Sequence, residues 1–375
     1  MAFFVILTFV FLTLYAALQS LLFKGLTNVF KAEKVFEKKP KVKNTFSIIC
    51  AARNEAGNIK NLISDLKGLD YPREKFEFIL IDDQSDDDTK EKALQALGDS
   101  ELDYKILDGK GGKKSSLWKG INEAKNEYVV FTDADCRLPA AWLKTYDTMF
   151  SKGDYKILSA PVFFEERNFL SQLFALEFAS LTASGAGALG AGFPLMANGA
   201  NLAARKDFLR EAREIYSSGE PSGDDVFLLI KAFEKYGAKG AGFIPAGDAL
   251  VLTEAPASLA AFFNQRIRWT KKSKHYRNPF IIGSALTVFL LALTMAILPF
   301  FAFVAGFKAV LWFVVAASLK TLIDSPLMFV YLKKFEKTKL LRWLFPLQFV
   351  YPFYIVITAL LSFAGASYEW KGRKA

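Results

Sequence analysis

Four short motifs of charged residues stand in order along the middle of this chain. They are Asp82-Asp83, Asp133-Ala134-Asp135, Gly223-Asp224-Asp225 and Gln265-Arg266-Ile267-Arg268-Trp269. Carboxylates at the ends of strands hold metal ions, and arginine binds phosphate oxygens. The set therefore predicts a site for a metal ion and a ligand that carries a diphosphate.

The Asp-x-Asp motif follows an apolar segment at 128–131. At the end of an extended strand, Asp133 and Asp135 would direct their carboxylates to the same side. Hard oxygen ligands suit Mg²⁺ or Mn²⁺, and a diphosphate would supply further oxygens. A lone Asp-x-Asp is common, so this prediction depends on the other motifs.

Asp82 and Asp83 end another apolar segment, and a polar loop follows them. The acids at 86–88 can cap the next helix, which leaves Asp82 and Asp83 available to contact a nucleotide. The glycine-rich segment 109–116 carries three lysines in front of a helix, which suits an anion such as a diphosphate. A solvated basic loop is the alternative, and the spacing of a Walker P-loop is absent.

Asp224 and Asp225 open a predicted helix. Either side chain can cap it, but one carboxylate could instead remove the proton from an incoming hydroxyl group. Displacement from the side opposite the diphosphate would invert the configuration and needs only one base. Arg268 would contact diphosphate oxygens and Trp269 would stack on a sugar, unless both only anchor the chain at a membrane surface.

The segments around these motifs predict a parallel sheet covered by helices, which binds its ligands at the carboxyl ends of its strands. The expected strands are 46–51, 76–81, 128–131 and 157–162. The expected amphipathic helices are 58–66, 88–97 and 115–124.

The rest of the chain is too apolar for an ordinary soluble domain, with 52% hydrophobic residues and 37 phenylalanines. Runs long enough to cross a bilayer lie at 2–23, 280–304, 310–332 and 344–363. The first is expected to be a membrane helix and not a signal peptide, because no Lys or Arg precedes it. We expect a membrane helix at 1–24, an α/β domain at 31–278, membrane helices at 279–367 and a basic tail at 368–375.

Basic residues set the expected orientation. They gather at 24–43, 271–277 and 333–342, on one side if the spans alternate, which puts the α/β domain in the cytoplasm. The basic tail would then lie outside, so the last apolar segment is expected to be re-entrant or interfacial.

Three further segments leave alternatives open. Residues 168–183 have a wide apolar face, which predicts a helix in the membrane interface or, alternatively, in the core. The Gly/Ala-rich run 184–192 is expected to be a flexible or closely packed turn region. Lys320 and Asp324 share one face of a membrane helix, as a structural ion pair or as part of an acceptor site.

Some function classes are excluded. The net charge of +10 comes largely from residues beside membrane spans, where they meet anionic lipid, so no nucleic-acid partner is expected. The two cysteines are expected to be free thiols in a reducing compartment. With a single histidine, His275, we expect neither a histidine-based metal site nor a Ser-His-Asp triad.

In this order the motifs resemble the family 2 inverting glycosyltransferases with the GT-A fold, in their membrane-anchored branch. The resemblance covers 45–277, from the segment Cys-Ala-Ala-Arg-Asn-Glu at 50–55 to the Gln-x-x-Arg-Trp motif at 265–269. It implies a Rossmann-like α/β domain with a mostly parallel sheet, a nucleotide-sugar donor (UDP-linked by resemblance) and a Mg²⁺ or Mn²⁺ cofactor. The family more often has a proline near Cys50, and Glu where this chain has Asp224.

The resemblance also implies a role for each matching residue. Asp225 would be the catalytic base. The donor nucleotide sugar would be bound by Arg53, Glu55, Asp83, Lys113, Asp133, Gln265 and Arg268. The metal ion would be held by Asp135 together with Asp133. The acceptor would be contacted by Trp269, Asp224 and Asn201, the last in a weaker match at 198–201.

The Gln-x-x-Arg-Trp motif occurs both in polysaccharide synthases and in ceramide and carotenoid glycosyltransferases. One helix before the domain and about three after it resemble the enzymes with lipid acceptors, because synthases usually need more crossings. The expected reaction is sugar transfer to a hydroxyl or carboxyl group of a lipid-like acceptor, with a glycan-extending synthase as the alternative. A non-catalytic sugar-nucleotide sensor is a further alternative, and the expected location is a bacterial inner membrane.

Overall fold

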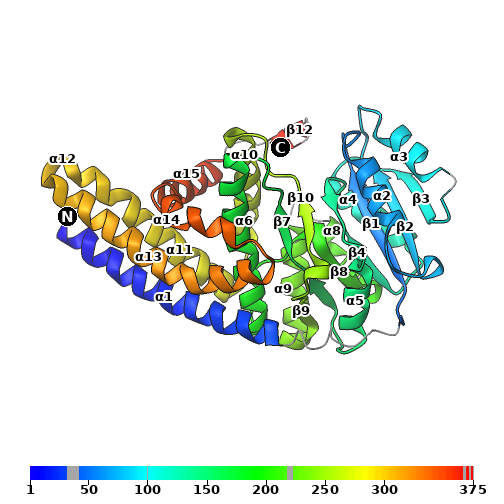
Figure 1. Ribbon diagram of the computed structural model, residues 1–375, viewed down its shortest axis with the longest axis horizontal. Helices are drawn as coiled ribbons and strands as arrows, with labels where there is room; N and C mark the ends of the chain where they lie inside the picture. The colour runs from blue at the N-terminus through cyan, green and yellow to red at the C-terminus, as the bar shows by residue number, and fades with distance from the viewer. Residues whose placement is uncertain (32–41, 99, 218–222, 366–368, 371–372, 375) are drawn as a thin grey trace.

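The computed structural model describes residues 1–31, 42–98, 100–217, 223–365, 369–370 and 373–374. Figure 1 shows an α/β part on one side and a bundle of long helices on the other. Some of the basic residues in the sequence prediction lie outside the described part, namely Lys34, Lys38, Lys39, Lys41 and Lys371.

A seven-stranded sheet forms the centre of the α/β part, in the order β3-β2-β1-β4-β8-β6-β9. Its strands are β1 (Phe46–Ala52), β2 (Phe76–Asp82), β3 (Asp103–Asp108), β4 (Tyr128–Phe131), β6 (Ile157–Ser159), β8 (Leu202–Arg205) and β9 (Ala241–Phe243). The first four run parallel, and β8 is antiparallel to both β4 and β6. The carboxyl ends of β1, β2 and β4 therefore meet at one edge, where ligands bind in such sheets.

The strands expected at 46–51, 76–81 and 128–131 are present. The strand expected at 157–162 is divided, because β6 joins the large sheet and β7 (Val162–Phe164) joins a second one. That smaller sheet has the order β5-β10-β7, with β5 at Cys136–Arg137 and β10 at Val251–Thr253.

Amphipathic helices cover the sheet. They are α2 (Ile59–Lys67), α3 (Thr89–Leu97), α4 (Lys113–Glu123), α5 (Trp142–Phe150), α7 (Lys206–Glu211), α8 (Glu214–Ser217) and α9 (Asp224–Tyr236). In α2, Ile59, Leu62, Ile63 and Leu66 are buried, which is the spacing of one helical face. The helices expected at 58–66, 88–97 and 115–124 are α2, α3 and α4.

Within the described residues, four helices are long and apolar enough to cross a membrane. Three belong to the bundle, α1 (Ala2–Lys31), α11 with α12 (Pro279–Ile297, Ala302–Ala305) and α13 (Phe307–Lys334), and the fourth is α6 (Phe169–Gly190). At the end of the bundle far from the sheet, Phe303 is 91% exposed. Such exposure of apolar side chains fits a surface that contacts lipid.

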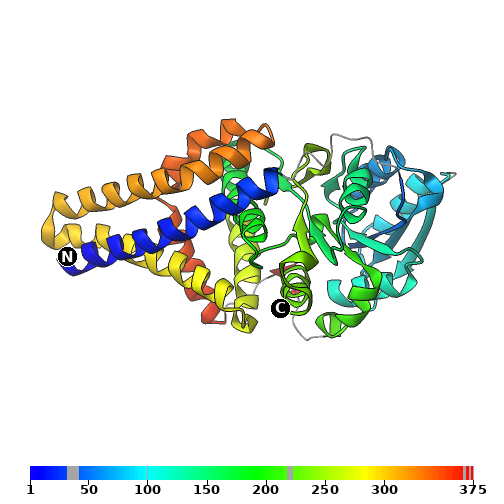
Figure 2. The ribbon, with the colours of Figure 1, turned by 90° about the horizontal axis from the view of Figure 1, so that it is seen from below.

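The expected last span is bent. Thr338–Leu347, which includes α14 (Leu344–Leu347), meets α15 (Tyr351–Phe363) at 76°. Figures 1 and 2 both show the chain ending beside the α/β part, where β11 (Glu369–Trp370) and β12 (Arg373–Lys374) pair. The bend is compatible with the expected re-entrant or interfacial segment, which stays a prediction.

Helix α6 lies at the junction of the two parts and runs across the bundle in Figure 1. Its second half contains the Gly/Ala-rich run at 184–192, which is mostly helical and not a turn. A Cβ at Gly187 would lie 2.4 Å from the Leu22 carbonyl oxygen, and one at Gly190 would lie 2.0 Å from that of Gly25. Small residues thus let α1 and α6 approach backbone to backbone. Most of α6 is buried, and its contact with a membrane interface stays a prediction.

Candidate active site

A cavity of about 1230 Å³ begins at the sheet edge and continues between the helices of the bundle. Most of the residues singled out from the sequence line it. These are Arg53, Glu55, Lys113, Asp133, Asp135, Asp224, Asp225, Gln265, Arg268 and Trp269. Asp82, Asp83 and Asn201 do not line it. Segments far apart in the chain therefore meet around one space.

The two acids of the Asp-x-Asp motif lie in the turn between β4 and β5 and face the cavity. Lys113, at the start of α4, forms an ion pair with Asp133 at 2.6 Å. Burial, and then the charge of Asp133, raise the pKa of Asp135 to about 6. Burial by itself would lower the pKa of Lys113, but the carboxylates of Asp133 and Asp224 outweigh it and raise that pKa.

This pair of carboxylates fits a divalent cation that also binds the substrate. The raised pKa of Asp135 reflects its burial first and then the neighbouring charge of Asp133, which Lys113 opposes. No group of three or more His, Cys, Asp or Glu side chains capable of holding a metal ion occurs among the described residues. Asp133 and Asp135 would thus supply two oxygen ligands, and the diphosphate and water the rest, as is usual for Mg²⁺ with phosphates.

Glu254 is an acid that the sequence analysis missed. It follows β10, which pairs antiparallel with β5 so that Thr253 stands opposite Cys136. The next pair in this register is Glu254 and Asp135, and both line the cavity. Nothing near Glu254 in the sequence marks it, because only the strand pairing brings it to the site.

Asp83 anchors the glycine-rich loop at 109–116 through hydrogen bonds. Its carboxylate accepts hydrogen bonds from the Gly112 backbone at 3.1 Å and the Ser116 hydroxyl at 2.9 Å, and the residue is 1% exposed. Gly111 and Gly112 have φ of 98° and 97°, a conformation that favours glycine. Asp83 thereby positions the loop that carries Lys113, and its contact with a nucleobase stays a prediction.

Arg53 and Glu55 line the cavity beyond β1. Arg53 donates to the Asp83 carbonyl at 3.0 Å and pairs with Asp86 at 2.6 Å, so it braces the loop after β2. Glu55 accepts from the Asn58 amide at 3.0 Å.

The first turn of α9 presents Asp224 and Asp225 to the cavity. Gly223, which precedes them, has φ of 97° and so permits the sharp entry into the helix. Asp225 accepts from the backbone N–H of Gly199 at 3.3 Å and from the Lys272 ammonium at 3.4 Å. These contacts fix the direction of the Asp225 carboxylate.

Burial, and then the neighbouring charge of Asp225, raise the pKa of Asp224, against the opposing effect of Lys113. Burial alone would lower the pKa of Lys272, yet the charge of Asp225 outweighs it and raises that pKa. The two acids and their lysines therefore form one charged network.

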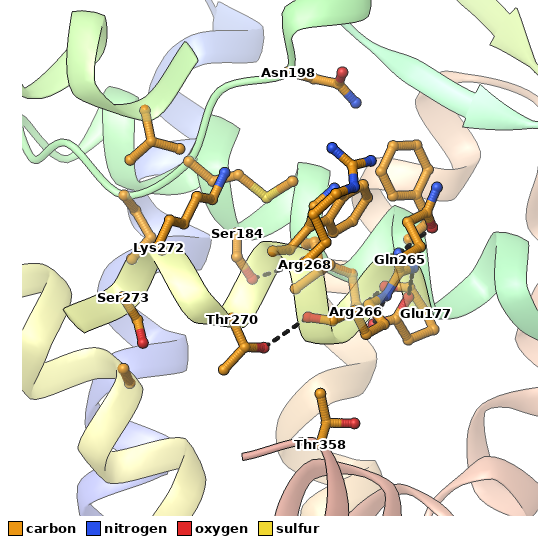
Figure 3. A pocket seen from close by; sticks show the side chains of 18 of the residues that line it. Glu177, Ser184, Asn198, Gln265, Arg266, Arg268, Thr270, Lys272, Ser273 and Thr358 are labelled. Carbon is orange, nitrogen blue, oxygen red and sulfur yellow. Dashed lines mark hydrogen bonds and ion pairs between the residues drawn. The ribbon is translucent and has the colours of Figure 1, made fainter. Parts of the chain in front are cut away.

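Helix α10 (Leu259–Lys271) presents one polar face to the cavity. Gln265, Arg268 and Lys272 follow at intervals of three and four residues, which places them on the same side. Figure 3 shows these three side chains extending toward the side of the cavity where Asn198 lies, with Thr358 on the opposite side. Lys272 had been assigned only to the basic cluster, although this spacing could have identified it.

Beneath that face, Arg266 and Glu177 of α6 form a buried ion pair that Figure 3 marks. The Tyr354 hydroxyl of α15 donates to the same carboxylate at 2.9 Å. Trp269 stands with its ring 4.3 Å from the Arg266 guanidinium carbon and packs on Phe178. This cluster joins α10 to the membrane helices.

Asn201 belongs to the core and not to the cavity lining. It is 0% exposed, and its amide oxygen accepts from Trp142 and Tyr146, both at 2.8 Å. Its amide nitrogen donates to two backbone carbonyls, so the capacity of the side chain is used. The acceptor contact expected of Asn201 is therefore replaced by a bracing role, and the nearby Asn198 lines the cavity instead.

The chain matches the models of two glycosyltransferase families. The model of Glycosyl transferase family 2 matches residues 47–178, and that of Glycosyl transferase family group 2 matches residues 128–364, more than half of the chain. The glycosyltransferase AglE of Haloferax volcanii is 31% identical over 99 residues, which are 26% of this chain and 33% of that protein. A poly-beta-1,6-N-acetyl-D-glucosamine synthase of Staphylococcus epidermidis is 33% identical over 89 residues, which are 24% and 21%. The matches thus span a third or less of these relatives' own lengths.

Among solved structures, the mannosyltransferase PcManGT of Pyrobaculum calidifontis, in complex with GDP-Man and Mn²⁺, resembles the whole chain. The TM-score is 0.55 at 19% sequence identity, and the alignment covers 93% of this chain and 99% of that one. At this identity the likeness concerns the fold. It confirms the expected GT-A α/β domain with flanking apolar helices.

Proposed function

The chain belongs to glycosyl transferase family group 2, and on that premise we propose that it transfers a sugar, with inversion, from a nucleotide-sugar donor to a hydroxyl group of a lipid-like acceptor. One observation carries the proposal. A single cavity holds the acidic motif of the sheet edge, the two acids of α9 and the basic face of α10, and it continues between apolar helices. A soluble acceptor would not need that apolar extension.

The proposed reaction follows from the positions of these groups around the cavity. Asp225 takes the proton of the acceptor hydroxyl, and the oxygen forms a bond to the anomeric carbon as the bond from that carbon to the diphosphate breaks. Lys113 and Arg268, which line the same cavity, would stabilise the negative charge on the departing nucleoside diphosphate.

A divalent cation bound at Asp133 and Asp135 would neutralise further charge on the leaving group. The Mn²⁺ in the mannosyltransferase supports such a cofactor, without favouring Mn²⁺ over Mg²⁺. That structure holds GDP-Man, whereas the family resemblance favours UDP. The donor assay below therefore tests both nucleotides.

The named relatives favour one other acceptor. The staphylococcal proteins are polysaccharide synthases, so extension of a glycan is the second candidate function. We favour the lipid-like acceptor because the cavity walls within the bundle include apolar side chains such as Leu286, Phe289 and Ile355.

The proposed setting is a bacterial inner membrane, with the α/β part in the cytoplasm. Lys31, Lys272 and Lys334 stand at or near those ends of α1, α11 and α13 that face the α/β part in Figure 1. Basic residues on that side agree with the positive-inside rule.

The test uses the purified full-length protein in lipid nanodiscs with labelled UDP- and GDP-sugars, Mn²⁺ or Mg²⁺, and a bacterial lipid extract. The expected product is one labelled sugar on an organic-soluble lipid, absent with Asp225→Asn. A long water-soluble glycan would favour the synthase instead. Binding of the nucleotide sugar without any transfer under all conditions would contradict both.

A further inference from the structure

A cluster of polar side chains lies inside the helical bundle, on the wall of the same cavity. Asp324 accepts hydrogen bonds from the Tyr15 hydroxyl at 2.7 Å, the Lys320 ammonium at 2.7 Å and the Gln348 amide at 3.0 Å. Gln19 donates to the Tyr15 hydroxyl at 2.8 Å. All five residues are at most 8% exposed.

The cluster lies deep in the bundle. Gln19 is twelve residues from the end of α1 at Lys31, which corresponds to about 18 Å of helix. Lys320 is fourteen residues from the end of α13 at Lys334, or about 21 Å. These depths fall within a hydrocarbon layer of about 30 Å, where polar groups are costly and usually functional.

Two acceptors of this cluster have no partner among the described residues, the amide oxygens of Gln19 and Gln348. The network fixes their orientation. Gln348 must present its N–H to the Asp324 carboxylate, and Gln19 must present its N–H because the Tyr15 hydroxyl already donates its proton to Asp324. Both oxygens are therefore acceptors that require a donor from elsewhere.

The charges of the cluster narrow the choice of ligand. Lys320 is paired with Asp324, so the cluster has no net charge, and the Lys320 ammonium lies 4.8 Å and 4.7 Å from the ring centroids of Tyr15 and Tyr351. A phosphate or carboxylate would meet the Asp324 charge and two carbonyl-type oxygens, which repel it. A neutral group with hydrogen-bond donors, such as a pair of hydroxyls, would complement the two amides.

We propose that this cluster is a subsite for a neutral, hydroxyl-bearing part of the acceptor, which donates hydrogen bonds to Gln19 and Gln348. The proposal rests on the proposed function and specifies its acceptor as an amphiphile with hydroxyl groups inside the bundle. The ion pair expected at Lys320 and Asp324 thus holds the amides in place, and the amides bind the ligand.

The test measures binding and not transfer. The full chain in phosphatidylcholine nanodiscs is titrated with monooleoylglycerol, which has two free hydroxyls, and with methyl oleate, which has the same acyl chain and none. Monooleoylglycerol is expected to raise the Tm and methyl oleate to leave it unchanged. Gln19→Leu and Gln348→Leu should each raise the apparent Kd for monooleoylglycerol on the order of tenfold. Gln95→Leu, at an exposed glutamine of α3, is the matched control and should have no effect.

Three results would overturn the subsite: equal Tm shifts with both lipids, a wild-type Kd in both leucine variants, or tighter binding of oleoyl lysophosphatidic acid than of monooleoylglycerol. If Gln348→Leu fails to fold because Asp324 loses a partner, Gln19→Leu decides alone. Binding of UDP or GDP with Mn²⁺ is measured in parallel. Its absence in the wild type would count against the proposed function, whereas the lipid comparison would still decide the subsite.

Discussion

The guanidinium of Arg266 and the carboxylate of Glu177 pair where the α/β part meets the membrane helices, and they are 3% and 4% exposed. Removing one partner of a buried pair leaves an uncompensated charge, which costs about 3–5 kcal/mol. Arg266→Met should therefore lower the free energy of unfolding by about that amount, measured by denaturant titration in detergent. Transfer should also fall at temperatures where the variant stays folded, because Gln265 and Arg268 share the helix.

Two variants serve as controls for this pair. Arg137→Met removes an exposed partner of Asp65, and such surface pairs contribute about 1 kcal/mol or less. The double variant Arg266→Met/Glu177→Met should recover much of the lost stability, since apolar side chains often replace a buried ion pair at little cost. An Arg266→Met protein as stable as the wild type would show that the pair has no such structural role.

The close approach of α1 and α6 gives a second prediction. A Cβ at Gly187 would lie 2.4 Å from the Leu22 carbonyl oxygen, so Gly187→Ala forces the helices apart. We expect a loss of about 1–3 kcal/mol, as for other overpacked contacts, read as a lower Tm. Gly283→Ala is the matched control, because nothing lies within 4 Å of its added methyl group. It should be neutral or stabilise α11 by up to about 1 kcal/mol. Equal Tm changes in the two variants would contradict this account of the packing.

The carboxylate pair predicts a measurable metal site. Asp135→Asn should weaken Mn²⁺ binding in the presence of a nucleoside diphosphate by at least roughly tenfold, since a charged ligand is replaced by a neutral one. Electron paramagnetic resonance of free Mn²⁺ measures this without any turnover. Asp248→Asn, at an exposed acid outside the cavity lining, should bind like the wild type. Unchanged Mn²⁺ affinity in Asp135→Asn would show that Asp135 does not hold the cation.

The parts of the fold that the sequence predicted share a physical cause. Strands β2 and β4 are buried along their whole length and β1 at every residue except Ala51, so the three strands consist mostly of apolar residues. Strand β3 was missed because it lies at the sheet edge, with both terminal residues exposed and the others half-buried. The run at 184–192 was read as a turn because small residues are typical of turns, whereas here they permit close helix packing.

Some residues of the candidate site could likewise be predicted from the sequence, and others could not. Acids that follow apolar strands could be predicted to meet, because parallel strands end at one edge. Glu254 could not be found, since its place depends on the pairing of β10 with β5. Asn201 was taken for an acceptor contact because a sequence does not reveal whether an amide faces a cavity or the core.

The raised pKa of Asp224 gives a prediction for the pH dependence of transfer. As the pH falls through that pKa, Asp224 takes up a proton and the negative charge beside Asp225 is lost. The rate of transfer should therefore change at a pH above the ordinary aspartate pKa of about 3.9. Asp224→Asn removes this titrating group, so the change should be absent in the variant while transfer continues. Asp225→Asn should abolish transfer at every pH and retain nucleotide binding.

Asp224→Asn should also change the pH dependence of the protein's stability. A carboxyl group whose pKa is raised by folding favours the folded state at low pH, and this contribution is lost as the pH rises from the unfolded toward the folded pKa. At pH 7 the buried Asp224 charge therefore destabilises the fold, and Asp224→Asn should raise the Tm there but not at pH 4. The reverse pattern, with Asp224→Asn inactive and Asp225→Asn active, would assign the base to Asp224, whose pKa is raised by burial and then by the charge of Asp225.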